Sequence, residues 1–97
     1  MTDDFEVTNH EAGGRYEAIV DGFTAELTYR LSGDRMVITH TAVTPAIEGR
    51  GVGSALVRAA VEDAAARDLT IVPLCPFVGA WLDRHPENKA KVARPGS

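Results

Sequence analysis

The hydrophobic pattern of this chain changes its period once, near Gly51, and this change restricts the folds open to it. Before Gly51, apolar and polar residues alternate, most cleanly in FTAELTYRL (residues 23–31), as in a strand with one buried face. From Gly51 to about Arg67, apolar residues recur at helical spacing. The two periods predict strands at 5–8, 15–20, 23–31, 35–43 and 69–74, and helices at about 51–67 and 76–84.

Short turns connect three of the predicted strands. Asp21-Gly22 and Ser32-Gly33-Asp34 favour tight hairpins, which predict an antiparallel meander. A strand, a helix and another strand follow, which predicts a right-handed, parallel βαβ unit. The expected fold class is α+β, with a mixed, mostly antiparallel sheet and the order β-β-β-β-α-β-α. A chain of 97 residues predicts one domain (1–97), with a core of about 5–87 and a tail over 88–97.

Composition limits the partners of the protein. The formal net charge of −4 argues against nucleic acid, whose binding depends on Lys and Arg at the phosphates. No apolar run approaches the roughly 20 residues that cross a bilayer, and the acidic start MTDDF is unlike a signal peptide, so we expect no membrane partner. The single cysteine, Cys75, excludes an internal disulfide and predicts a cytoplasmic location. No pair of His, Cys, Asp or Glu has metal-ligand spacing, so we expect no metal.

Three glycines within five positions, Gly49, Gly51 and Gly53, come directly before the predicted helix. Glycine is costly to order, and a turn between a strand and a helix needs only one. A nucleotide P-loop would place Lys after its last glycine, where this chain has Ser54, and a dinucleotide-binding loop needs a larger parallel sheet. The remaining functional interpretation is a loop of bare N–H groups at a helix N-terminus, which binds an anion without a lysine. The alternative is a loop that only turns the chain.

The stretch TPAIEGRGVGSALVRAA (residues 44–60) resembles the acetyl-CoA pyrophosphate loop of the GNAT acetyltransferase superfamily, whose pattern is Gln/Arg-x-x-Gly-x-Gly/Ala. Gly51 and Gly53 occupy the two small-residue positions, and Glu48 stands where Gln or Arg is usual. The wider arrangement ITHTAV…GRGVGSALV…IVPLCPFV…HPE resembles a subgroup of unusually short GNAT-like proteins, over about residues 6–87. The resemblance implies a GNAT-like acyl-CoA N-acyltransferase fold and an N-acetyltransferase that uses acetyl-CoA. The usual N-terminal helices would be missing, because residues 8–15 leave no room for them.

The resemblance also implies where the coenzyme binds. Acetyl-CoA would lie between two parallel strands that splay apart, with its diphosphate on the glycine loop. Pro73 and Thr44-Pro45 supply a reason for the splay, because proline has no N–H for the ladder, although both prolines are equally compatible with ordinary strand ends. The candidate binding residues are Val43, Glu48, Gly49, Arg50, Gly51, Val52, Gly53 and Ser54.

Cys75 and His40 are the candidates for the chemistry. Cys75 precedes Pro76, which suits the first position of a helix, so Cys75 would be an N-cap residue where the helix dipole favours a thiolate. Such a thiolate could accept the acetyl group or act as the base that takes the amine proton. His40 lies on the neighbouring parallel strand, and alternation would place it on one face with Ile38 and Ala42. The structural alternatives are a small buried hydrophobe and a core histidine; the resemblance implies that both residues take part in catalysis.

The missing helices predict an open acceptor side, suited to a protein lysine, a peptide or a polyamine. The alternative function is a non-catalytic acyl-CoA-binding or protein-interaction module on the same fold. Of the remaining residues, Tyr16, Tyr29 and Trp81 are interpreted as core residues, and His85 as the residue that closes the second helix before Pro86.

Overall fold

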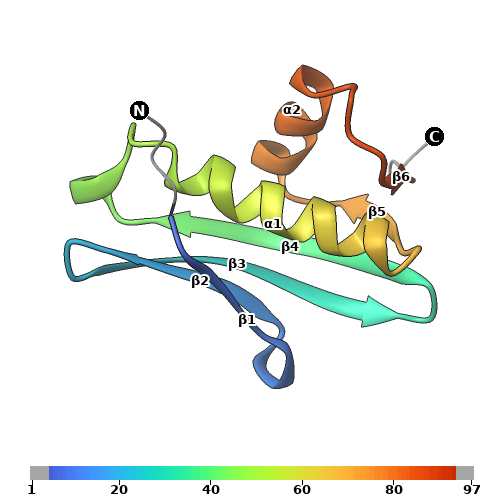
Figure 1. The fold of residues 1–97 in the computed structure, drawn as a ribbon, viewed down its shortest axis with the longest axis horizontal. Helices are drawn as coiled ribbons and strands as arrows, with labels where there is room; N and C mark the ends of the chain where they lie inside the picture. The colour runs from blue at the N-terminus through green and yellow to red at the C-terminus, as the bar shows by residue number, and fades with distance from the viewer. Residues whose placement is uncertain (1–4, 94–97) are drawn as a thin grey trace.

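The computed structural model describes residues 5–93, which form one six-stranded sheet with both α-helices on the same face (Figure 1). The strands lie in chain order, β1 to β6; the first three pairings are antiparallel and the last two are parallel. The predicted α+β class with a mixed sheet is therefore confirmed. The elements are β1 (Val7–His10), η1 (Glu11–Gly13), β2 (Arg15–Val20), β3 (Phe23–Ser32), β4 (Arg35–Val43), η2 (Pro45–Ile47), α1 (Val52–Ala66), β5 (Thr70–Pro73), α2 (Pro76–Arg84) and β6 (Lys91–Val92).

The two ends of the fold differ from the sequence prediction. The first strand begins at Val7, two residues later than the predicted start at Phe5, and a single 3-10 turn, η1, follows it. At the other end, where we expected a tail, β6 adds a sixth strand that pairs in parallel with β5. Ala90 packs against the core, and the Ala93 amide donates to the Ile71 carbonyl at 2.8 Å. A two-residue strand carries no period of its own, so the sequence pattern did not reveal it.

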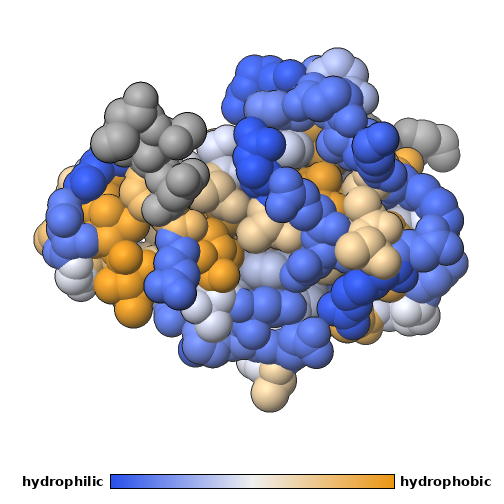
Figure 2. Space-filling model, in the orientation of Figure 1, coloured by the Kyte–Doolittle hydropathy of each residue, from blue (hydrophilic) through white to orange (hydrophobic). Residues whose placement is uncertain are grey.

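The core lies between the sheet and the helices. Tyr16, Tyr29 and Trp81 are at most 5% exposed, as expected of core residues. Each polar tip has a partner: Tyr16 donates to Asp63, Tyr29 donates to Asn9, and Trp81 donates to Ser54. Apolar surface also remains outside the core. Figure 2 shows apolar side chains gathered at the end of the molecule that carries the turn between β2 and β3, where Ile19 is 65% exposed and Phe23 is 43% exposed.

A β-bulge at Thr39 interrupts β4. Tyr29 lies opposite Ile38, but its neighbour Thr28 lies opposite His40, so Thr39 is an extra residue in the ladder. Directly opposed residues of an antiparallel pair share a face of the sheet. Ile38 therefore shares the helix-covered face with the buried Tyr29, whereas His40 shares the opposite face with Thr28. The prediction that His40 and Ile38 share a face is wrong, because the bulge cancels one step of the alternation.

Candidate active site

The parallel pairing of β4 and β5 ends early and leaves a wedge between them. Ile38 and Pro73 form the last registered pair, and β4 continues to Val43 without a β5 partner among residues 5–93. Pro73 ends the ladder as predicted, because it has no N–H to donate. After it, the Leu74 and Cys75 amides both donate to the Ile38 carbonyl, at 3.0 and 3.3 Å. Main-chain groups on the free edge of β4 thus face the wedge.

A cleft of about 600 Å³ lies beside this free edge, on the helix-covered face. Seven of the eight residues proposed from the sequence to bind the coenzyme line it: Val43, Glu48, Gly49, Gly51, Val52, Gly53 and Ser54. The remaining lining residues are Thr41, Ile47, Phe77 and Arg84, which sequence reasoning did not select. Phe77 and Arg84 are seven residues apart on α2, the spacing that places side chains on one helix face. That spacing was the only sequence signal for them.

Arg50, the eighth proposed residue, does not line the cleft. Its guanidinium forms an ion pair with Asp21, in the turn between β2 and β3. The loop therefore contributes backbone and one acidic side chain, Glu48, to the cleft, and its arginine is directed toward the hairpin.

The first turn of α1 presents unused amides to the cleft. The Ala55 amide donates to the Gly51 carbonyl, which begins the intrahelical ladder, and no side chain caps the helix. Within the described part of the chain, the amides of Val52, Gly53 and Ser54 have no acceptor. Unpaired N–H groups and the dipole of a helix 15 residues long together favour an anion at this point.

Glycine is required at residues 49, 51 and 53 for two different structural reasons. Gly49 and Gly51 adopt φ of +82° and +86°, a left-handed conformation that is strained for residues with a Cβ atom. Gly53 lies inside α1, where a Cβ atom would be 3.0 Å from Cζ of Phe77 and 3.5 Å from a methyl carbon of Val43. Two glycines therefore shape the loop, and the third lets α2 approach the start of α1.

Cys75 is the N-cap residue of α2, as predicted, and it is 8% exposed. Its Sγ lies 3.6 Å from Oγ1 of Thr41, to which the thiol donates a hydrogen bond. Thr41 lines the cleft and Cys75 does not, so this hydrogen bond connects the thiol to a residue of the cleft lining. The structure thus brings Cys75 together with Thr41, on the helix-covered face of β4.

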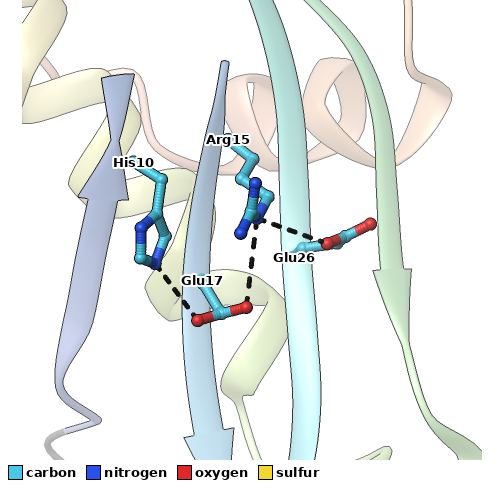
Figure 3. A network of polar contacts seen from close by, with 4 residues as sticks. All are labelled: His10, Arg15, Glu17 and Glu26. Carbon is cyan, nitrogen blue, oxygen red and sulfur yellow. Dashed lines mark hydrogen bonds and ion pairs between the residues drawn. The ribbon is translucent and has the colours of Figure 1, made fainter. Parts of the chain in front are cut away.

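His40 is exposed on the opposite, uncovered face, and its side chain has no hydrogen bond or ion pair to any residue from 5 to 93. The strand registers place Glu26 opposite Ala42, two pairs along β4 from His40 and on the same face. Glu26 belongs to a polar network on this face, drawn in Figure 3, in which Arg15 lies between the carboxylates of Glu17 and Glu26. Nε2 of His10 lies 3.1 Å from the Glu17 carboxylate in the same network. Cys75, which contacts Thr41, therefore lies on the helix-covered side of the sheet, and His40 lies on the uncovered side.

The far wall of the cleft is fixed by contacts between α1 and α2. The Trp81 indole donates to the Ser54 hydroxyl at 2.7 Å, and its ring stacks on His85 with centroids 3.9 Å apart. Nδ1 of His85 lies 2.9 Å from the Trp81 carbonyl oxygen, so this histidine closes α2 as the sequence indicated.

Between residues 5 and 93, no group of three or more His, Cys, Asp or Glu side chains could hold a metal ion. Neither α1 nor α2, the two α-helices in that part of the chain, has the length and apolar character that a membrane span requires.

Comparison with known proteins agrees with this geometry. A family model described as GCN5-related N-acetyl-transferase matches residues 15–92. The chain is also similar to a protein from Staphylococcus aureus with a solution NMR structure, described as a "GCN5-like putative N-acetyltransferase". The identity is 27% and the TM-score 0.72, over 96% of this chain and 92% of that one. A search of curated proteins gave no match. The family match spans strands β2 to β6, the glycine loop and both α-helices, and the chain belongs to the GCN5-related N-acetyltransferase family.

Proposed function

We propose that this protein transfers an acetyl group from acetyl-CoA to an amine, in the cytoplasm. The observation that carries the proposal is the row of unpaired amides at Val52, Gly53 and Ser54, which open into a cleft of about 600 Å³ beside the β4–β5 wedge. A diphosphate fits these donors without any lysine. The apolar walls formed by Val43, Ile47 and Phe77 suit the arm that joins the diphosphate to the thioester.

Acetyl-CoA supplies an activated acetyl group whose thiolate leaves readily, so the protein must supply an oxyanion donor and a base. A main-chain N–H on the free edge of β4 would stabilise the negative charge that develops on the carbonyl oxygen. Such a donor is preorganised, because the β3 pairing holds that part of β4 in place.

The two faces of β4 suggest a division of roles. Cys75 lies on the side of the cleft and would either take the acetyl group covalently or act as a base through Thr41. His40 lies on the uncovered face, from which an amine can approach the wedge, and would take the proton of the incoming ammonium. Glu17 and Glu26, on that same face, would attract a cationic acceptor such as a protein lysine, a peptide or a polyamine.

The test separates binding from turnover. Cys75→Ala and His40→Ala should each lower turnover by at least about 100-fold while CoA affinity, measured by calorimetry, stays within about twofold. His10→Ala is the control for loss of an imidazole, because His10 lies on the same face in the same cross-strand row. Its contact with Glu17 means that any effect should appear in the KM for the acceptor and not in kcat. Mass spectrometry after mixing with acetyl-CoA distinguishes the two roles of Cys75: a stable acetyl adduct on Cys75 supports the covalent relay.

Two outcomes would overturn the proposal. Failure of CoA to bind or to raise the melting temperature would exclude the coenzyme site itself. Tight CoA binding without transfer to any polyamine or lysine peptide would instead assign the non-catalytic acyl-CoA-binding module. The burial of Cys75 and its absence from the cleft lining favour that alternative.

A further inference from the structure

The glycine loop brings little positive charge to the coenzyme that it is proposed to bind. Glu48, in the position where the family motif has Gln or Arg, lines the cleft with a carboxylate. Arg50 is paired with Asp21 and lies outside the cleft lining. The coenzyme carries a diphosphate and a 3′-phosphomonoester, so the loop amides alone would have to compensate several negative charges. A cationic side chain from elsewhere in the fold would add charge-assisted hydrogen bonds to those that the amides supply.

Arg84 is placed to supply that cation. It is the last residue of α2, and it lines the same cleft as the unpaired amides of α1. Its side chain has no hydrogen bond, ion pair or ring contact with any described residue. Other arginines near the helices are engaged: Arg58 lies over the Trp81 ring, and Arg67 pairs with Glu11.

The packing of α2 holds Arg84 at this position. Trp81, one turn earlier, is fixed by its hydrogen bond to Ser54, and Phe77 at the start of the helix packs against Gly53. The face of α2 that carries Phe77 and Trp81 thus contacts the first turn of α1, and the same face carries Arg84 at its C-terminal end. A guanidinium there lines the same cleft as the glycine loop and can contact an anion bound in it.

We propose that Arg84 binds a phosphate group of the coenzyme and supplies the positive charge that Glu48 cannot supply. This inference rests on the proposed function, since it concerns the same cleft. It names a specificity residue on α2, outside the glycine loop, that recognises either the diphosphate or the 3′-phosphate.

The experiment compares three variants in calorimetric titrations with CoA and with 3′-dephospho-CoA. Arg84→Gln should weaken CoA binding by about 10- to 100-fold, the loss typical of one charge-assisted hydrogen-bonding group. Arg84→Lys should restore part of that loss, because the charge remains while the bidentate geometry does not. Arg30→Gln is the control, since it removes an equal charge from an exposed arginine on the uncovered face of the sheet. Raising the ionic strength should reduce the difference between wild type and Arg84→Gln.

Comparing CoA with 3′-dephospho-CoA identifies which phosphate group Arg84 contacts. If Arg84 contacts the 3′-phosphate, the ratio of affinities between wild type and Arg84→Gln falls to about one with 3′-dephospho-CoA. If it contacts the diphosphate, the ratio is the same for both ligands. Either result supports the proposal. A wild type that binds CoA while Arg84→Gln binds it within about twofold would overturn the role of Arg84 and leave the proposed function standing. A wild type that does not bind CoA would overturn both.

Discussion

Glu48 is the residue of the glycine loop whose charge opposes the ligand proposed for that loop. It is exposed and lines the cleft, and it follows η2, the 3-10 turn that leads out of β4. Glu48→Gln should tighten CoA binding by about two- to fivefold at low salt, because a like charge near the phosphates is removed. Calorimetry at two ionic strengths measures this, and the gain should shrink at the higher one. Glu62→Gln, on the exposed side of α1 and outside the cleft, is the control; equal effects from both would contradict a local role for Glu48.

Tyr16 makes stability depend on pH in the alkaline range. It is 1% exposed, and its hydroxyl donates to Asp63 at 2.8 Å. Burial, followed by the hydrogen bond and charge of Asp63, raises the pKa of Tyr16 above its ordinary value, and burial also raises the pKa of Tyr29. The folded state therefore keeps protons that the unfolded state releases. The stability linked to these tyrosines is complete below about pH 10 and decreases as the pH rises further.

Urea unfolding between pH 8 and 11 tests this linkage. Above about pH 10, the free energy of unfolding should fall by up to about 1.4 kcal/mol per pH unit for each tyrosine. Tyr16→Phe should lower stability at pH 8 by about 1 kcal/mol, because Asp63 loses its donor, and should make the alkaline decline shallower. An unchanged alkaline slope in Tyr16→Phe would show that another group controls it. The exposed Lys91–Asp68 pair is present in both proteins and cancels in the comparison.

At the scale of one element, the bulge of β4 places Ile38 and His40 on opposite faces of the sheet although they are two residues apart. Thr39 is the extra residue, and removing it would leave Ile38 on the helix side and His40 on the uncovered side in regular alternation. Deletion of Thr39 should therefore preserve the β3–β4 register and the fold, as seen by circular dichroism. It should lower CoA affinity by at least about tenfold, because a straight strand no longer diverges from β5 in the same way.

Thr39→Ala is the control for this deletion. It keeps the extra residue and removes only the exposed 3.3 Å hydrogen bond from the Thr39 hydroxyl to the Thr28 carbonyl. We expect its CoA affinity and stability to match the wild type closely. If the deletion variant folds and binds CoA as the wild type does, the bulge has no part in shaping the wedge.

At the scale of the whole molecule, β6 connects the end of the chain to the rest of the domain. It covers the outer edge of β5, and Lys91 forms an exposed ion pair with Asp68. Truncation after Glu87 should lower the free energy of unfolding by about 2 kcal/mol, through loss of backbone hydrogen bonds and of the Ala90 contact with the core. Truncation after Ala93 keeps β6 and is the control, so the difference between the two truncated proteins in the same urea titration measures the contribution of residues 88–93. Equal stability of both truncated proteins would mean that β6 contributes nothing.

Sequence reasoning predicted those parts of the molecule that local patterns control. Alternation predicted the strands of the meander, helical spacing placed α2 at Pro76–Arg84 and α1 to within one residue at each end, and Pro73 marked the end of the parallel ladder. Seven of the eight proposed coenzyme residues line one cleft, because six of them lie within residues 48–54, at the loop and the start of α1. The seventh, Val43, is at the end of β4. Arg50 was the exception, since its partner Asp21 is 29 residues earlier in the chain.

The features that the sequence did not predict depend on contacts between distant residues. Composition, hydrophobic period and the glycine loop are properties of neighbouring residues. The amino-acid sequence by itself therefore determined the α+β class, the crossover helix and the position of the glycine loop. The bulge at Thr39, the pairing of Cys75 with Thr41 and the contribution of Arg84 to the cleft arise from pairing and packing across the sheet. Only the tertiary structure decided these, because register between strands and the approach of two helices are set by the whole core rather than by any local pattern.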